Sequence, residues 1–331
     1  RIASGSNGHT CAVTLTGGVK CWGSNYAGQL GDGTRERRLT AVDVIGLSAG
    51  VTAISLGQSY SCALTSAGGV KCWGYRTGDG TVNGSTQPVD VPGLSSGVSA
   101  ISAGESEICA LTTAGGVKCW GHTLSPVDVA GLSSGVVAVA AGWKAKCVIT
   151  SSGGVKCWGG WPLGDGAGQG SDTPVDVVGL GAGVAAISPS AGGFCAVTTA
   201  GAALCWGMNY PGDGSVGTAL LPVVPTGLGS GVAAISTAGR LTCVLMTSGG
   251  VKCWGANDRG GVGVGTFNGI WFSPVDVVGL NSGVIAIGTA HSTACALMSS
   301  GGAKCWGYNL EGTVGDGTQI DRHTPTDVVG F

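Results

Sequence analysis

The sequence is poor in charge and has no long apolar run. Only 10% of its 331 residues are Asp, Glu, Lys or Arg, whereas an average globular protein has about 25%. The net charge is −2, and no basic stripe of the kind that binds phosphate backbones is present, so we expect no nucleic-acid partner. No run of about 18 apolar residues occurs, and a membrane-spanning helix is therefore not predicted.

The motifs of common enzyme classes are also missing. The sequence contains no phosphate-binding loop, dinucleotide fingerprint, paired catalytic carboxylates or nucleophile elbow. Its four histidines, His9, His122, His291 and His323, occupy different positions in the repeat pattern and predict neither a metal site nor a catalytic triad. We therefore expect a protein that is not an enzyme and that has no cofactor and no bound metal.

Glycine and cysteine are abundant, with 66 and 14 residues. The cysteines form pairs whose members are 10 positions apart, and Trp-Gly follows the second cysteine of every pair. The seven pairs are Cys11 with Cys21, Cys62 with Cys72, Cys109 with Cys119, Cys147 with Cys157, Cys195 with Cys205, Cys243 with Cys253 and Cys295 with Cys305. The regular spacing predicts one repeated structural unit per pair.

Each pair predicts a β-hairpin. If Cys62 faces Cys72, then Leu64 faces Val70 and a three-residue loop remains, which normally ends in a left-handed residue. The third loop position is always glycine, which adopts that conformation without a steric clash. These glycines are Gly17, Gly68, Gly115, Gly153, Gly201, Gly249 and Gly301.

The opposed cysteines predict cross-strand disulfides. Directly opposed residues of an antiparallel pair lie about 4.5–5.5 Å apart, a separation that a disulfide spans. A zinc site is the alternative, but two sulfurs per hairpin without a Cys-x-x-Cys motif make a poor zinc set. Disulfides persist in oxidising compartments, so we expect an extracellular or cell-surface protein. The sequence starts at Arg1 without methionine or an apolar leader, which fits a removed signal peptide better than a fragment.

Further strands follow each hairpin. A Pro-Val-Asp-Val segment and a Gly-Leu-x-x-Gly-Val-x-Ala-Ile segment recur, and proline at the start of a strand suits a sheet edge. Four short strands per period of roughly 40 to 50 residues predict a propeller blade. We predict an all-β fold: a seven-bladed β-propeller with four antiparallel strands and one cross-strand disulfide per blade. The single domain would span 1–331, with approximate repeats 1–46, 47–94, 95–132, 133–180, 181–228, 229–280 and 281–331.

The motifs resemble the regulator of chromosome condensation repeat. Residues 25–34 match the loop of that repeat most fully. Cys-Ala-Leu-Thr occurs at 62–65 and 109–112, and Lys-Cys-Trp-Gly occurs in six of the seven units. The resemblance implies the same seven-bladed fold. The family's namesake is a nuclear nucleotide-exchange factor, whose compartment does not suit disulfides. The Ser-Gly-Val-x-Ala-Ile segment at 96–101 is similar to a secreted bacterial branch, the propeller-type β-lactamase inhibitors, which bind a protein through one face.

Two repeated features have structural interpretations. Gly-Asp-Gly recurs at 31–33, 78–80, 164–166, 212–214 and 315–317. Calcium at these loops is an alternative, but each loop offers one carboxylate where calcium prefers several oxygens, so we favour an Asp that caps its own turn. Lysine precedes the second cysteine in six repeats and Leu204 replaces it in one. We expect the lysine stem to pack near the adjacent tryptophan ring.

The variable loops supply the candidate interface. Charged, aromatic or large apolar side chains concentrate at Arg35, Arg37, Arg38, Trp161, Phe267, Ile270, Trp271 and Phe272. Clustered arginine and aromatic residues are typical of protein-binding surfaces. Alternatively, these loops fold over the rim and cover the edge strands. The first inner strand is also short, which fits ordinary ring closure or an edge completed by a neighbouring molecule. The lone Asn83-Gly84-Ser85 sequon carries little weight.

These observations predict a non-catalytic extracellular scaffold with a structural or adhesive role. Its protein partners would include copies of itself, in filaments or surface arrays. A monomeric secreted binder or inhibitor that acts through one propeller face is the alternative, and a glycan-binding or enzymatic propeller is the third hypothesis.

Overall fold

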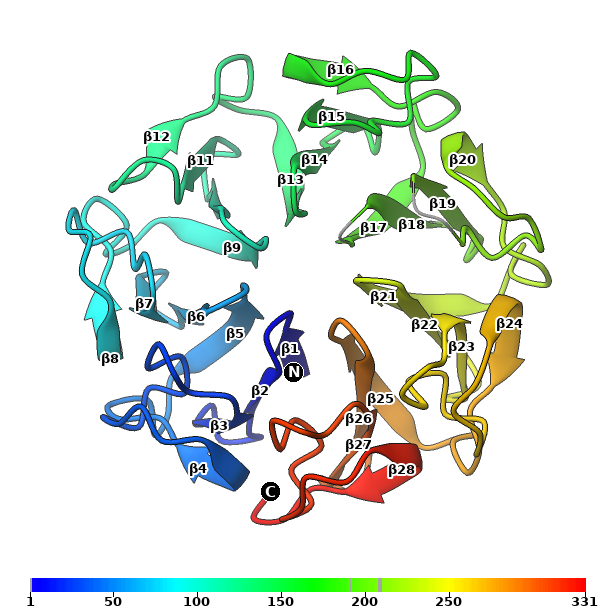
Figure 1. Cartoon of the computed structure of the whole chain (residues 1–331). Helices are drawn as coiled ribbons and strands as arrows, with labels where there is room; N and C mark the ends of the chain where they lie inside the picture. The colour runs from blue at the N-terminus through cyan, green and yellow to red at the C-terminus, as the bar shows by residue number, and fades with distance from the viewer. Residues whose placement is uncertain (1, 191, 208–209) are drawn as a thin grey trace.

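The computed structural model describes residues 2–190, 192–207 and 210–331 as a ring of seven four-stranded antiparallel sheets (Figure 1). Each sheet is one blade, with its first strand at the centre of the ring and its fourth at the rim. This arrangement confirms the predicted seven-bladed propeller.

The strands of the blades have the following bounds. Blades 1 to 4 comprise β1 (Ile2–Gly5), β2 (His9–Val13), β3 (Val19–Gly23), β4 (Arg38–Asp43); β5 (Val51–Leu56), β6 (Tyr60–Thr65), β7 (Val70–Gly74), β8 (Ser85–Asp90); β9 (Val98–Ala103), β10 (Ile108–Thr112), β11 (Val117–Trp120), β12 (Val127–Asp128); β13 (Val136–Ala141), β14 (Ala145–Thr150), β15 (Val155–Gly159), β16 (Ser171–Asp176). Blades 5 to 7 comprise β17 (Val184–Pro189), β18 (Gly193–Thr198), β19 (Ala203–Gly207), β20 (Ala219–Val223); β21 (Val232–Ala238), β22 (Leu241–Met246), β23 (Val251–Ala256), β24 (Ile270–Asp276); β25 (Val284–Thr289), β26 (Thr293–Met298), β27 (Ala303–Gly307), β28 (Arg322–Asp327).

The hairpin register agrees with the prediction in every blade. In blade 2, Cys62 lies opposite Cys72 and Leu64 opposite Val70, and Gly68 at the third loop position has a φ of 76°. The glycine loop and the opposed cysteines therefore determine the register together.

The seven predicted disulfides are all formed, one per blade, and no cysteine is free. Every predicted pairing is confirmed, because the two cysteines of each hairpin are direct cross-strand neighbours. The bonds join Cys11 to Cys21, Cys62 to Cys72, Cys109 to Cys119, Cys147 to Cys157, Cys195 to Cys205, Cys243 to Cys253 and Cys295 to Cys305.

The core lies between blades rather than within them. One cluster joins Val19 and Leu30 of blade 1 to Ile54 and Trp73 of blade 2. The indole N–H of Trp73 donates to the Gln29 carbonyl of the preceding blade at 2.8 Å. Each blade is therefore stabilised by apolar burial against its neighbours.

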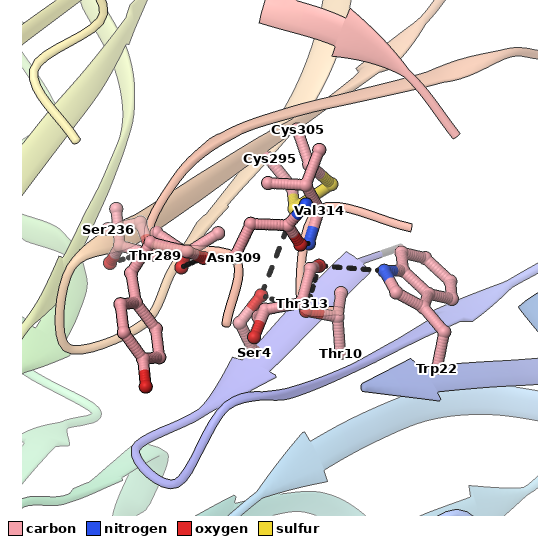
Figure 2. Close-up of a disulfide and its surroundings, with 12 residues drawn as sticks. Ser4, Thr10, Trp22, Ser236, Thr289, Cys295, Cys305, Asn309, Thr313 and Val314 are labelled. Carbon is pink, nitrogen blue, oxygen red and sulfur yellow. Dashed lines mark hydrogen bonds between the residues drawn. A yellow bond between two sulfur atoms is a disulfide. The ribbon is translucent and has the colours of Figure 1, made fainter. Parts of the chain in front are cut away.

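The ring closes where blade 7 meets blade 1 (Figure 2). The indole N–H of Trp22 donates to the Thr313 carbonyl at 2.8 Å, and the Thr313 hydroxyl donates to the Gly8 carbonyl at 3.0 Å. The two sheets share no strand. Side-chain packing and hydrogen bonds hold this seam, and β1 has 4 residues where β5 has 6.

The ring has two faces that differ in their loops. We call the end that carries the hairpin turns between second and third strands the hairpin face; the linkers from one blade to the next lie there as well. The opposite end, the long-loop face, carries the variable loops between third and fourth strands, such as residues 24–37 of blade 1. The candidate interface residues therefore belong to the long-loop face or to the strands that leave it.

The repeated lysine forms a salt bridge with the aspartate of the fourth strand. Lys71 Nζ lies 2.7 Å from Asp90 Oδ1, and the lysine side chains of the six pairs are 26–35% exposed. The pairs are Lys20–Asp43, Lys71–Asp90, Lys118–Asp128, Lys156–Asp176, Lys252–Asp276 and Lys304–Asp327. In blade 5, Leu204 replaces the lysine and Val224 stands where the aspartate would be.

Candidate protein-binding surface

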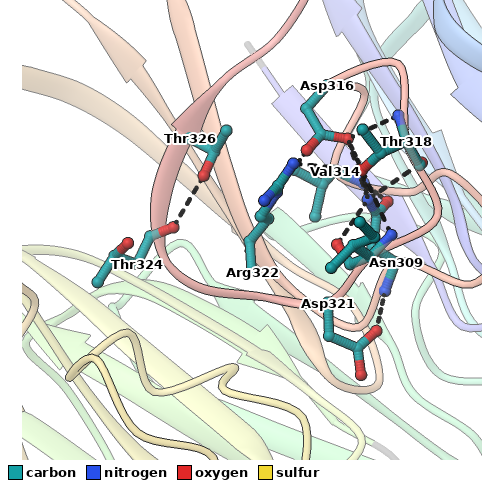
Figure 3. A network of polar contacts seen from close by, with 9 residues as sticks. Asn309, Val314, Asp316, Thr318, Asp321, Arg322, Thr324 and Thr326 are labelled. Carbon is teal, nitrogen blue, oxygen red and sulfur yellow. Dashed lines mark hydrogen bonds and ion pairs between the residues drawn. The ribbon is translucent and has the colours of Figure 1, made fainter.

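The long loops of blades 1 and 7 are held by a buried asparagine. In blade 7, Asn309 donates to Asp316 Oδ1 at 3.1 Å and to the carbonyls of Thr318 and Ile320, and its side-chain oxygen accepts from Val314 N–H (Figure 3). The same contacts recur around Asn25 in blade 1. These hydrogen bonds hold residues 25–34 of blade 1 and the corresponding loop of blade 7 in a fixed shape, which we call the platform of each blade.

The Gly-Asp-Gly carboxylates cap their own turns. Asp316 accepts from the backbone N–H and hydroxyl of Thr318 and pairs with Arg322 at 2.5 Å. Burial raises its pKa, but the bonds from Thr318 and Arg322 outweigh that effect and the pKa is lowered. Asp79 and Asp213 likewise cap Thr81 and Ser215. Within the described residues, no group of three or more His, Cys, Asp or Glu side chains is placed to hold a metal ion.

The three candidate arginines have different surroundings. Arg38 pairs with Asp32 at 2.7 Å and belongs to the platform of blade 1. Arg37 donates to the Leu310 carbonyl and pairs with Glu311, so it crosses the seam between blades 1 and 7. Arg35 is exposed and donates to the Tyr26 carbonyl at 3.3 Å.

The candidate residues of blade 6 lie around β24. Phe267 is 60% exposed and stacks on His323 of blade 7, with ring centroids 4.8 Å apart. Ile270 and Trp271 pair with Ala256 and Gly255 of β23, and Trp271 is 36% exposed. Phe272 packs edge-on against Tyr210 of blade 5, with ring centroids 5.7 Å apart. Phe267 and Phe272 therefore contact two different neighbouring blades.

Trp161 lines a groove on the long-loop face where blades 4, 5 and 6 meet. This aromatic groove has a volume of about 350 Å³ and is lined by Trp143, Trp161, Pro162, Tyr210 and Arg240, among others. The tryptophans are 46% and 43% exposed. Phe272 contacts Tyr210, which lines this groove. Arg37 of blade 1 lies away from it, at the seam between blades 1 and 7.

The aromatic groove combines aromatic rings with positive charge. Lys144 Nζ lies 4.4 Å from the ring centroid of Trp143, and Arg240 lies over the ring of Tyr210 and donates to its hydroxyl. Cations over aromatic faces hold both groups in place. Exposed Trp, Tyr and Arg are the residues that most often anchor protein interfaces.

Sequence reasoning missed Trp143, Tyr210 and Arg240. Trp143 and Arg240 lie in the short turns between first and second strands, at positions occupied by small or polar residues in most other blades. A large aromatic residue at such a turn was the available signal. Tyr210 follows blade 5's third strand and is buried, so its role depends on contacts between blades.

The repeated disulfide hairpin and the ring of four-stranded sheets define the chain as a disulfide-linked β-propeller. Models of the regulator of chromosome condensation (RCC1) repeat match residues 1–29 and 16–64. These matches identify RCC1-type repeats in residues 1–64, and together with the seven-bladed fold they support an RCC1-repeat family protein. No curated protein sequence matches the chain.

Several solved structures share the fold. Prp20p from Saccharomyces cerevisiae has a TM-score of 0.83 at 19% identity, over 96% of this chain and 87% of that chain. Human WBSCR16 has a TM-score of 0.81 at 21% identity, over 94% of both chains. The ectodomain of the Arabidopsis thaliana receptor kinase ACR4 has a TM-score of 0.58 at 17% identity, over 99% and 96%. At these identities the likeness concerns the fold alone.

The described part of the chain contains no helix with the length and apolar character to cross a bilayer.

Proposed function

We propose that the chain is a non-catalytic extracellular scaffold with a structural or adhesive role, whose long-loop face binds proteins, copies of the chain included. The aromatic groove around Trp143 and Trp161 carries the proposal, because it presents exposed tryptophans on a rigid frame. A preformed aromatic surface loses little side-chain entropy on binding.

Two parts of the proposal, protein binding and an extracellular location, have support from similar proteins and from the disulfides. Prp20p is reported to bind Gsp1p and histones, and a second structure holds the same yeast protein, RCC1 (Prp20), bound to Kap60. Protein binding is thus a property of that propeller. The receptor-kinase likeness concerns an ectodomain, and disulfides in all seven blades suit an oxidising compartment.

Electron microscopy of the unreduced protein over a concentration series tests this function. We expect rows or fibres of discs for the native chain and isolated discs for the double variant that combines Trp143→Ala with Trp161→Ala. Val82→Ala is the matched control, because Val82 is 68% exposed on a loop of blade 2, and it should assemble normally. The proposal would be refuted if the native chain forms only isolated discs and also retains no secreted protein that the double variant fails to retain.

A monomeric binder or inhibitor is the second candidate. The concave shape of the aromatic groove favours it, because a pocket of this size accepts an inserted loop of a foreign protein. In that case the native chain stays monomeric and retains a partner that the double variant loses. Binding of a glycan that depends on both tryptophans would instead support the third hypothesis.

A further inference from the structure

Most lysines and arginines of this chain form an ion pair with a carboxylate. The six repeated lysines pair with the aspartates of the fourth strands, and Lys146 pairs with a glutamate of blade 3. Within the described part of the chain, Lys144 alone among the lysines has no carboxylate partner. Of the described arginines, Arg35, Arg76 and Arg240 have none. These four cations are therefore free to pair with a carboxylate of another molecule.

Two of the four cations meet in the aromatic groove. Lys144 belongs to blade 4 and Arg240 to blade 6, on either side of blade 5 in the ring (Figure 1). Each lies in the turn between the first and second strands of its blade, a turn that contains neither lysine nor arginine in the other five blades. The closed ring therefore brings together the two turns that carry such a charge.

The aromatic groove has no carboxylate of its own. Among the described residues that line it, none is Asp or Glu. In blade 3, Glu107 pairs with Lys146, and Glu105 lines the central channel rather than the groove. In the long loop of blade 4, Asp165 accepts from the Ala167 N–H at 3.0 Å and caps its own turn. The positive charge of the groove is thus not neutralised by the protein itself.

Aromatic rings hold both cations in position. Lys144 Nζ lies 4.4 Å from the ring centroid of Trp143. Arg240 Cζ lies 5.2 Å from the ring centroid of Tyr210, and the guanidinium donates to the hydroxyl of that tyrosine. A guanidinium has several N–H donors, so others remain for a ligand. A carboxylate matches these donors well, because it accepts two parallel hydrogen bonds from one guanidinium.

The rest of the lining favours a peptide over a sugar. Phe194, Pro162 and the two half-exposed tryptophans form apolar surface that suits a large apolar side chain. Sugar hydroxyls need acceptors as well as donors, but no Asn, Gln, Asp or Glu side chain occurs among the described residues of the lining. The groove therefore combines apolar contact with hydrogen-bond donors for an anion.

We propose that the aromatic groove binds an acidic segment of a different protein, in which a carboxylate stands next to an aromatic or large apolar side chain. The carboxylate accepts hydrogen bonds from Lys144 and Arg240, and the apolar side chain contacts Trp143 and Trp161. Binding covers the cations from water, which strengthens charge-assisted hydrogen bonds. This inference rests on the proposed function, because it names the chemistry of the partners other than copies of the chain.

The chain itself does not supply such a segment. None of its carboxylates without an ion pair has an aromatic residue within two positions in the sequence. These carboxylates belong to Glu36, Asp79, Glu105, Asp165, Asp172, Asp213 and Asp258. A different protein is therefore the better match for this groove than a second copy.

Selection of random heptapeptides displayed on phage tests the inference on the full chain. Peptides are selected on the native chain and counter-selected on the double variant that combines Trp143→Ala with Trp161→Ala. We expect enriched peptides with Asp or Glu next to an aromatic residue or leucine. Enrichment of neutral or basic peptides would overturn the inference and leave protein binding by the groove, and so the proposed function, intact. No enrichment would overturn the inference, and disc assembly and partner retention would then decide the proposed function separately.

Fluorescence polarisation with the most enriched peptide gives a second readout. Lys144→Gln combined with Arg240→Gln should weaken binding at least about tenfold and reduce its salt dependence, because charge-assisted hydrogen bonds are lost. Arg76→Gln is the matched control, since Arg76 also lies over a tyrosine ring without a carboxylate partner but outside the groove. Unchanged binding by the paired variant, or equal weakening by the control, would overturn the inference.

Two other results would assign the cations to different ligands. Binding of labelled heparin that requires Lys144 and Arg240, without binding of an acidic peptide, would assign them to an anionic glycan and overturn the inference. Rows of discs that the native chain forms and the paired glutamine variant does not would assign them to contacts between copies. That result would overturn the assignment to a different protein.

Discussion

We predict that the buried side chain of His9 makes the fold less stable in mild acid. Its side chain is fully buried, its Nε2 lies 3.1 Å from the Ser61 hydroxyl, and that hydroxyl donates to the Gln29 carbonyl at 2.8 Å. The Ser61 oxygen thus accepts from the neutral ring. Burial lowers the pKa of His9 from 6.5 to about 4.

The sign and size of the effect follow from proton linkage. Between pH 6.5 and 4 the unfolded chain binds a proton at His9 that the folded chain does not, so stability falls as the pH falls. A pKa difference of about 2.5 corresponds to roughly 3 kcal/mol by pH 4 and about 2 kcal/mol at pH 5. The carboxylates with lowered pKa values, such as Asp32, lose their contribution only below their ordinary value of 3.8. The pH range in which His9 lowers stability, 6.5 to 4, therefore lies above the range in which these carboxylates do so.

Urea unfolding followed by tryptophan fluorescence between pH 7 and pH 4.5 measures this effect. His9→Leu removes the titration and places there the residue that blade 6 has as Leu241. We expect a steep loss of stability with acid for the native chain and a flatter profile for His9→Leu. Glu105, whose pKa is raised by burial, is common to both proteins and cancels in the comparison. Equal slopes for the two proteins, or the same flattening in the exposed His122→Gln control, would refute the reasoning.

Three further predictions concern the blades. Replacing both cysteines of one hairpin with alanine should lower the unfolding free energy by about 3 kcal/mol, the value expected for a short closed loop. In hydrogen exchange, loss of the bond between Cys109 and Cys119 should deprotect its blade more than loss of the bond between Cys243 and Cys253, because the outer strand β12 of the first blade has only 2 residues. Equal deprotection of the two blades would contradict this prediction. In a double-mutant cycle, Leu204→Lys with Val224→Asp should show a favourable coupling of about 0.5 kcal/mol that weakens with salt. A coupling of zero would show that a Lys–Asp salt bridge at this position contributes nothing measurable. Asp316→Ala should lower stability by about 2 kcal/mol at pH 7, because charge-assisted bonds to a buried carboxylate are lost. Thermal unfolding measures this loss, and Thr324→Ala, at an exposed position of β28, provides the comparison.

The local pattern predicted the hairpins well. Each Cys-x-x-x-x-x-x-x-x-x-Cys unit holds its own turn glycine and its own disulfide, so register and cross-link follow from adjacent residues. The Lys–Asp pairs were missed because third and fourth strands are separated by loops of variable length. The joint change to Leu204 and Val224 was the available signal, since the two positions alter together.

The candidate surface was less predictable. Arginine and aromatic residues drew attention to the long loops, but a sequence does not show that Arg38 pairs with Asp32 or that Arg37 reaches Glu311. Both contacts depend on loop geometry or on the neighbouring blade. The aromatic groove likewise brings together residues of three blades, from Trp143 to Arg240, and only the closed ring places them side by side.

The order of the cysteines along the chain has a consequence for biogenesis. Every cysteine is bonded to the next or the previous cysteine in the sequence, with a separation of 10 residues. A chain that emerges from its N-terminus presents each pair together before the following pair appears. Oxidation in order of emergence therefore yields the native set, and a nascent propeller can be cross-linked hairpin by hairpin without reshuffling.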